Sequence, residues 1–201
     1  MKRIQNKYDL VVVGGGHAGI EASLIAHKRG IKTILVSMDK NSVGRTSCNP
    51  AVGGLAKGQM VKEVDVLGGI MGFFADLSTL QSKTLNKSKG RSVWSPRSQI
   101  DKNLYEKIAQ EHIKEQNLDV FEGEVVSLDI KNSSVSGVFL KDGSKIVCSS
   151  VILTCGTFLN GLIHIGSKQI NAGRYGEKRA EGITENLNSL GLKSGRLKTG
   201  T

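Results

Sequence analysis

Aromatic residues, cysteines and long apolar runs are scarce in this chain of 201 residues. One Trp, three Tyr and five Phe are too few for an aromatic base-stacking sheet of the RNA-recognition type. The three cysteines, Cys48, Cys148 and Cys155, show no CxxC pairing and no His-rich spacing, so neither a disulfide framework nor a metal site is expected. No apolar run approaches the roughly 20 residues that cross a bilayer. The first ten residues show no secretory signal either. We therefore expect a cytoplasmic protein with no membrane segment.

Acidic residues are outnumbered in a composition that is otherwise ordinary for a globular domain. The 28 Lys and Arg against 18 Asp and Glu give a formal net charge of +10, with basic clusters at residues 83–91 and 174–179. An excess of this size attracts polyanions if it gathers on one face, and is a solvated surface if it does not. Composition alone leaves both interpretations open.

Residues 8–37 have the order strand, glycine turn, helix and strand. The run Leu10–Val13 is short, β-branched and bounded by glycine, which predicts a strand buried on both faces of a parallel sheet. Small and apolar residues at helical spacing follow up to Gly30, a typical helix stop. Lys32–Ser37 then predicts a second strand. The pattern is that of a βαβ unit.

The turn of this unit contains G-x-G-x-x-G, which is typical of dinucleotide binding. The first glycine allows a sharp turn, the second allows close approach of a pyrophosphate, and the third allows the helix to pack on the strand. Asp39 is a candidate ligand of the ribose, and His17 is interpreted as a residue of the turn rather than a proton-transfer group. The alternative is a purely structural glycine turn. The predicted cofactor-binding residues of the turn are Gly14, Gly15, Gly16, His17, Ala18 and Gly19.

The second half of the chain distinguishes a flavoprotein from a nicotinamide dehydrogenase. After a helix predicted at residues 99–116, the segments LDVFEGEVVSLDI, VSGVFLKDG and SKIVCSSVILTCGT indicate an antiparallel β-meander with a hairpin turn at Lys141–Gly143. The meander returns to a buried strand, Val151–Leu153, which is followed by T-x-G. A nicotinamide dehydrogenase would continue to alternate strands and helices. The sequence therefore predicts an α/β, Rossmann-like fold with a β-meander insertion.

This arrangement resembles the two-dinucleotide flavoproteins related to glutathione reductase. The resemblance implies FAD as the cofactor, with the backbone of Val125 against the adenine. More specifically, the stretches GGGHAGIEA, SCNPAVGGLAKGQMVKEVDVLGG, LNKSKG, WSPRSQID, TCGTFLNGLIHIG and GRLKTGT resemble the N-terminal third of the tRNA uridine 5-carboxymethylaminomethyl modification enzymes, the MnmG or GidA family. Two departures are Arg91-Ser92, where many members have Pro-Ala, and Ala180, where relatives often carry serine.

The family resemblance implies a cytoplasmic FAD enzyme that modifies carbon 5 of the wobble uridine in tRNA together with the GTPase MnmE. It also implies methylenetetrahydrofolate as one-carbon donor, NADH as reductant of the flavin, and a homodimer. Residues 1–201 would then be an incomplete FAD-binding domain, without the NAD region and the C-terminal helical domain. A chain of this kind is expected to have no turnover alone. The alternatives are a flavin- or nucleic-acid-binding module, and a generic FAD-dependent oxidoreductase.

Cys48 is the candidate catalytic residue. Thiolate addition at carbon 6 of uridine makes carbon 5 nucleophilic, and backbone N–H groups and Lys57 near Cys48 favour the thiolate. The alternative is a packing thiol, and a disulfide reductase is disfavoured because no second cysteine lies nearby. Cys148 and Cys155 are expected to be structural, and Asn49, Gly53 and Gly54 to shape the flavin pocket. A tRNA-facing surface is expected at Lys89, Arg91, Arg97, Arg174 and Arg196.

Overall fold

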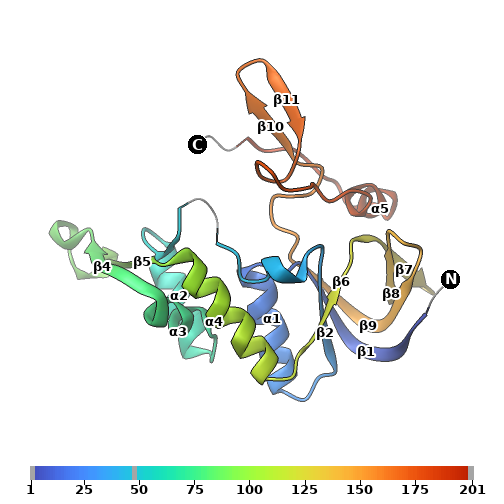
Figure 1. The fold of residues 1–201 in the computed structure, drawn as a ribbon, viewed down its shortest axis with the longest axis horizontal. Helices are drawn as coiled ribbons and strands as arrows, with labels where there is room; N and C mark the ends of the chain where they lie inside the picture. The colour runs from blue at the N-terminus through green and yellow to red at the C-terminus, as the bar shows by residue number, and fades with distance from the viewer. Residues whose placement is uncertain (1–2, 47–48, 199–201) are drawn as a thin grey trace.

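The computed structural model describes residues 3–46 and 49–198 and has an α/β fold built on a six-stranded sheet (Figure 1). The strand order is β6-β2-β1-β9-β8-β7; β6, β2, β1 and β9 are parallel, and β7 and β8 join β9 in antiparallel pairs. The predicted Rossmann-like fold with a meander is confirmed. The strands are β1 (Arg3–Val13), β2 (Thr33–Ser37), β6 (Asp119–Glu122), β7 (Val125–Lys131), β8 (Ser134–Leu140) and β9 (Lys145–Leu153).

Both faces of the parallel strands are covered, which explains the uninterrupted apolar run in β1. Leu10 and Val12 pack in one core cluster with residues of α1 (His17–Lys28) and α4 (Lys102–Glu115). Val11 and Val13 point to the other face, where they pack in a second cluster with the meander and with Ile183 of α5 (Ile183–Ser189). All four side chains are buried, as predicted. Gly30, with a positive φ, follows α1 and its cap, as predicted.

The meander prediction is confirmed for β7, β8 and β9 but wrong for the segment before them. The hairpin turn at Lys141–Gly143 joins β8 to β9, as expected. Residues 119–122, however, form β6, which pairs in parallel with β2 and therefore belongs to the dinucleotide-binding half of the sheet. The reason is a long-range pairing that the local alternation of apolar residues does not reveal.

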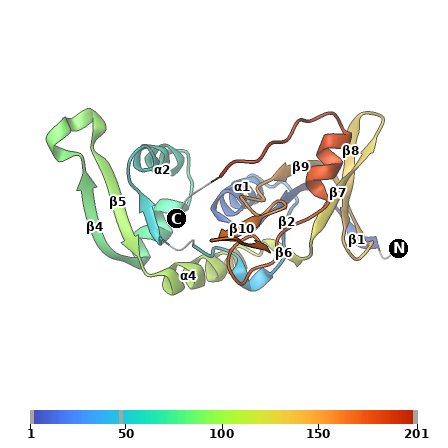
Figure 2. The same cartoon turned by 90° about the horizontal axis from the view of Figure 1, so that it is seen from above.

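An inserted unit follows β2 and the short turn η1 (Lys40–Ser42). Its sheet has the order β3-β5-β4, and Figures 1 and 2 show the β4–β5 hairpin projecting from the body of the protein. Glu21 of α1 anchors the unit, because its carboxylate accepts hydrogen bonds from the N–H groups of Ile70 (3.0 Å) and Met71 (2.6 Å). The elements of the unit are β3 (Ala51–Gly53), α2 (Lys57–Val66), α3 (Met71–Ser78), β4 (Thr79–Leu85), η2 (Lys87–Lys89), η3 (Arg91–Val93) and β5 (Ser95–Ile100).

The helix predicted at residues 99–116 begins later than expected. Gln99 and Ile100 belong to β5, and α4 begins only after Asp101. The Asp101 carboxylate accepts hydrogen bonds from the N–H groups of Asn103 (2.9 Å) and Leu104 (3.0 Å), which is the usual role of aspartate as N-cap. The cap therefore fixes the boundary between strand and helix.

The last part of the described chain leaves β9 and crosses above the carboxyl edge of the sheet. It contains the hairpin of β10 (Leu162–Ile165) and β11 (Lys168–Asn171), followed by α5 (Figure 1). In the described ranges, every helix is too short or too polar to span a bilayer.

Candidate functional site: the glycine turn

The glycine turn lies at the carboxyl edge of the parallel sheet, between the ends of β2 and β9. The N–H of Gly14 donates to the carbonyl of Val36 at the end of β2 (2.8 Å). The N–H of Thr154, directly after β9, donates to the carbonyl of Val13 (2.8 Å). On one side of β1 lies β2, the next strand in the chain, and on the other side lies β9, so the strand order reverses at β1. Open α/β sheets bind ligands at such a switch point.

Two of the three motif glycines are required by packing inside the protein. Gly14 has φ +112°, and a Cβ there would lie 2.4 Å from the carbonyl oxygen of Thr154. A Cβ on Gly19 would overlap the carbonyl oxygen of Gly14 and lie 2.9 Å from Oγ1 of Thr154. Thr154 fixes the turn because its hydroxyl donates to the carbonyls of Val13 (2.8 Å) and Gly14 (3.1 Å). The third glycine thus has the packing role expected from the sequence.

Gly16 differs from the other two because nothing in the protein requires it to be glycine. Its φ of −76° and ψ of −175° suit any L-amino acid, and a Cβ there would have no heavy atom within 4 Å. Gly16 and Ala18 are exposed at the start of α1. No described side chain caps this helix, and its first turn contains no acidic residue. Backbone N–H groups and the positive end of the helix dipole therefore face open space, an arrangement that suits a phosphate group.

We predict that Gly19→Ala destabilises the protein by roughly 3 kcal/mol or more. Alanine normally stabilises a helix by about 1 kcal/mol relative to glycine. Here the added methyl group overlaps backbone of the turn, and overpacking of this kind costs several kcal/mol when the backbone cannot move. Urea unfolding followed by circular dichroism measures the change. An increase in stability would show that Gly14 and Gly19 are not in close contact.

His17, the first residue of α1, points into the protein and contacts α4. Its Nδ1 shares a hydrogen bond of 3.3 Å with the hydroxyl of buried Tyr105, and the two rings meet edge to face. Burial, and secondarily the positive charge of Arg174, lowers the pKa of His17. Burial, and then the negative charge of Glu21, raises the pKa of Tyr105. At neutral pH this pair is uncharged and holds the turn against α4.

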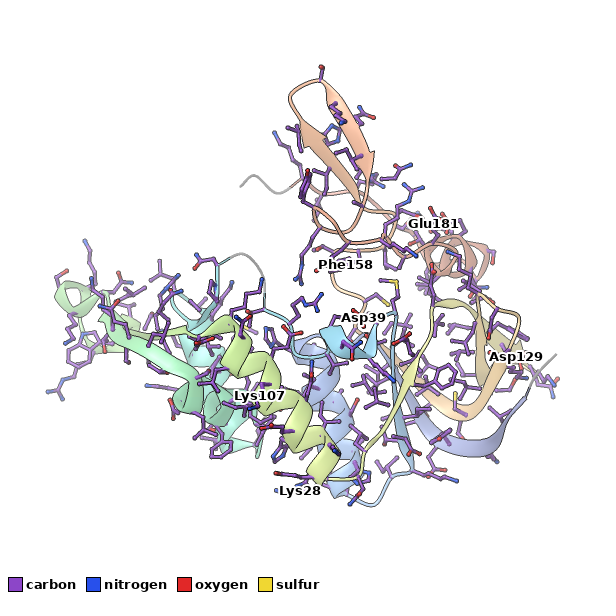
Figure 3. All side chains as sticks on the ribbon, in the orientation of Figure 1. Lys28, Asp39, Lys107, Asp129, Phe158 and Glu181 are labelled. Carbon is purple, nitrogen blue, oxygen red and sulfur yellow. The ribbon has the colours of Figure 1, made fainter. Side chains whose placement is uncertain are left out.

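Gly15, Asp39 and Val125 are three further predicted ligands of the cofactor. A Cβ on Gly15 would lie 2.8 Å from Cγ2 of Val43, so this position is also tightly packed. Asp39, labelled in Figure 3, follows β2, and its carboxylate accepts a hydrogen bond from the N–H of Asn41 (2.9 Å). Val125 is buried in the same cluster as Val13. The roles of Asp39 at the ribose and of the Val125 backbone at the adenine stay predictions.

The candidate catalytic residue Cys48 lies outside the described residues. The chain leading to it is held by ion pairs: Arg45 contacts Glu106 of α4 (3.3 Å) and Glu177 (3.6 Å). Arg174 donates to the carbonyl of Thr46 (3.4 Å), and its guanidinium lies 5.0 Å from the ring centre of Phe158. The segment that precedes Cys48 is thus fixed both to α4 and to the chain that crosses above the sheet.

The other two cysteines have environments that suit structural roles. Cys148 is buried in β9, and burial raises the pKa of its thiol to about 11. Cys155 is half-buried after β9, and burial raises its pKa as well. Both thiols are therefore protonated at neutral pH. Among residues 3–46 and 49–198, no group of three His, Cys, Asp or Glu side chains is placed to bind a metal ion.

Three further residues singled out in the sequence, Gly53, Asn49 and Ala180, make contacts within the protein. Gly53 packs against the carbonyl of Pro96, because a Cβ there would lie 2.2 Å from that oxygen. Asn49 accepts a hydrogen bond from Arg97 (3.2 Å). Ala180 is buried, and its N–H donates to the carbonyl of Phe158 (3.0 Å). Each of these residues thus has a structural contact within the protein, and the proposed part of Asn49 and Gly53 in a flavin pocket stays a prediction.

The five basic positions expected on one surface lie on separate elements. Lys89 and Arg91 are at the tip of the β4–β5 hairpin, and Arg97 is on β5. Arg174 follows β11 and donates to the carbonyl of Thr46 (3.4 Å), and Arg196 donates to the carbonyl of Asn160 (3.0 Å). Of these five residues, only Lys89, Arg91 and Arg97 therefore belong to one hairpin.

Two residues that fix the turn were missed in the sequence. Thr154 belongs to the T-x-G stretch, which indicated a flavoprotein class but not a hydroxyl that bonds to the turn. Tyr105 has no local signal at all, because it lies 88 positions from His17 in the chain. The glycine pattern itself was sufficient to locate the turn.

Comparison with known proteins agrees with this geometry. The family model described as glucose inhibited division protein A matches residues 9–201. The tRNA uridine 5-carboxymethylaminomethyl modification enzymes MnmG of Cytophaga hutchinsonii and Karelsulcia muelleri are 48% and 50% identical to 97% of this chain, which spans 32% of each relative. The crystal structure of Aquifex aeolicus GidA superimposes with a TM-score of 0.88 at 44% identity, covering 92% of this chain and 31% of that one. The chain therefore spans about a third of the length of these relatives.

Proposed function

The chain belongs to the glucose inhibited division protein A family, and from this premise we propose that it is the FAD-binding N-terminal part of a tRNA-modifying enzyme. The modification proposed is the addition of an aminomethyl-type or carboxymethylaminomethyl group to carbon 5 of the wobble uridine. The observation that carries the proposal is the open helix N-terminus at Gly16 in a chain that aligns with these relatives along almost all of its length.

The residues of the glycine turn fit the pyrophosphate of FAD. Gly14, Gly15 and Gly19 are tightly packed against the protein and hold the backbone in place, whereas Gly16 and Ala18 border open space. Backbone N–H groups at the start of α1 would donate to the phosphate oxygens, and the helix dipole would favour their negative charge. A neutral His17 adds no charge of its own, and it positions the turn through Tyr105. Asp39 is proposed to hold the ribose and the Val125 backbone to contact the adenine.

The remaining roles belong to the complete enzyme. FAD supplies two-electron redox chemistry when it is bound. We propose Cys48 as the residue that acts on the uridine, with tRNA and methylenetetrahydrofolate as substrates and NADH as reductant of the flavin. The GTPase MnmE and a second copy of the chain are the proposed partners, and the cytoplasm is the proposed location.

We further propose that residues 1–201 form part of a larger FAD-binding domain. On the side of β9 away from β1, β8 pairs only with residues 145–147. Residues 148–153 have no partner strand on that side among the described residues, and Ile152 is 39% exposed there. An apolar residue on an open strand edge is usually covered by further chain. The relatives, which are about three times as long, contain sequence that fits this need.

A chimeric enzyme tests the proposed function. Residues 1–198 of this chain replace the matching segment of the Cytophaga hutchinsonii relative, and the chimera is expressed in bacteria that lack their own enzyme of this family. Mass spectrometry of tRNA nucleosides is expected to show the modified wobble uridine with the chimera, and none with the 201-residue chain alone. A chimera that folds and holds FAD but leaves the uridine unmodified would contradict the proposed function.

A further inference from the structure

The β4–β5 hairpin carries half of the formal net charge of the protein. Residues 79–100, called here the arm, contain five basic residues and no acidic residue, whereas the whole chain has a formal net charge of +10. The arm projects from the rest of the protein in both views (Figures 1 and 2). The basic residues of the arm are Lys83, Lys87, Lys89, Arg91 and Arg97.

The charges of the arm are not neutralised by the described protein. Lys83, Lys87, Lys89 and Arg91 are exposed, and none of the four forms an ion pair with an acidic side chain in residues 3–46 or 49–198. Lys83 and Arg97 occupy directly opposed positions of β4 and β5. Like charges at opposed positions destabilise a β-ladder, so the hairpin maintains this pair at a cost in stability. A polyanion bound along the arm would remove that repulsion.

The arm also presents an aromatic surface beside these charges. Trp94, the single tryptophan of the chain, is 38% exposed, and its indole N–H donates to the carbonyl of Lys87 (3.2 Å). The guanidinium of Arg91 lies 5.8 Å from the centre of the indole ring. The hydrogen bond fixes the ring at the tip of the hairpin. Fixed indole and guanidinium planes are the groups on which proteins stack unpaired bases.

We propose that the arm is an RNA-binding surface, in which the four exposed basic residues contact phosphates and Trp94 with Arg91 stacks an unpaired base. Phosphates match an acid-free row of Lys and Arg, and unpaired bases match the aromatic surface at its end. The identification of the RNA as the loop of a tRNA rests on the proposed function. Arg174 and Arg196, which contact backbone carbonyls elsewhere, are not part of this surface.

Trp94 allows binding to be measured on the unmodified chain. The probe is a 17-nucleotide anticodon stem–loop RNA with uridine at the wobble position, added to the 201-residue protein while tryptophan emission is recorded. Stacking is expected to quench the emission, and added salt to reverse the quenching. Heparin, a polyanion without bases, is expected to bind without the same quenching.

Unchanged emission at saturating RNA overturns the stacking contact. A larger response to phosphatidylserine vesicles than to RNA would identify a membrane surface instead.

Matched charge variants test the phosphate contacts. One variant changes Lys83, Lys87, Lys89 and Arg91 to Gln, and the control changes four exposed lysines elsewhere, Lys28, Lys102, Lys168 and Lys193, to Gln. Each variant loses four positive charges from the formal net charge of +10, so the two remain matched in net charge. Anisotropy of fluorescein-labelled RNA is expected to show a salt slope reduced by about 3 in the arm variant, since each contact contributes about 0.7 to 0.9. The slope of the control is expected to change by less than about 1. Equal losses in the two variants overturn the proposal.

Two substitutions of Trp94 test the base contact in the same assay. Trp94→Leu is expected to weaken RNA binding by about 5- to 100-fold, and Trp94→Phe to restore part of the loss, because a smaller ring still stacks. Equal affinities of the Leu and Phe variants would overturn a stacking role. FAD affinity is expected to be unchanged in every arm variant, so loss of RNA binding is distinguishable from failure of the flavin site.

Discussion

Replacing Gly16 with valine is expected to leave the chain folded and to reduce its affinity for FAD by about 100-fold or more. The backbone at Gly16 already has a conformation that suits valine, and a Cβ there would have no heavy atom of the surrounding protein within 4 Å. It would instead occupy the space in front of the α1 N-terminus, where the pyrophosphate is proposed to bind. Titration calorimetry with FAD measures the affinity, and circular dichroism measures the fold.

The matched control for this substitution is Gly195→Val. Gly195 is also exposed, and a Cβ there would also have no heavy atom of the surrounding protein within 4 Å, but it lies far along the chain from the glycine turn. This variant is expected to bind FAD as tightly as the unmodified chain. Valine at the N-cap of a helix costs about 1 kcal/mol, so a small loss of stability in Gly16→Val is expected. Undiminished FAD affinity of Gly16→Val would show that the pyrophosphate does not approach this residue.

Replacing Cys48 with serine is expected to lower wobble-uridine modification by the chimera on the order of 100-fold or more, as for a lost acid, base or nucleophile. In the proposed step the Cys48 sulfur bonds to carbon 6 of the uridine, and the electron pair of the 5,6 double bond becomes available at carbon 5. Serine keeps the size and hydrogen bonding of cysteine but does not ionise near neutral pH. FAD content is expected to persist, because the glycine turn holds the cofactor.

Cys148→Ala is the control for loss of a thiol. Cys148 is buried, its pKa is raised to about 11, and it is therefore protonated at neutral pH. The substitution is expected to reduce stability through the lost packing, with the modification retained below the unfolding temperature. Near-normal modification by Cys48→Ser, measured by nucleoside mass spectrometry, would identify Cys48 as a packing residue.

The parts of the fold that depend on local pattern were predictable from the sequence. The apolar run of β1, the glycine turn, α1 with its stop at Gly30, and the hairpin at Lys141–Gly143 are each encoded within a few residues. Gly14 and Gly19 also have the conformational and packing reasons that the motif implies.

The features that escaped prediction depend on contacts between distant parts of the chain. β6 joins the parallel sheet only because β2, more than 80 positions earlier, offers a free edge. Tyr105 reaches His17 across 88 positions. The start of α4 was misplaced because Gln99 and Ile100 fit a helical pattern, whereas pairing with β3 and β4 makes them a strand. The five basic residues share only their charge in the sequence, whereas in the fold Arg174 follows β11 and Arg196 follows α5, so neither belongs to the arm.

The central claim is that the glycine turn holds FAD, and titration calorimetry of the unmodified chain with FAD and with NAD tests it most directly. The open N-terminus of α1 and the meander beside it predict binding of about one FAD per chain, with NAD at least about 100-fold weaker. Clear binding of NAD by a folded chain that has no affinity for FAD would contradict the account.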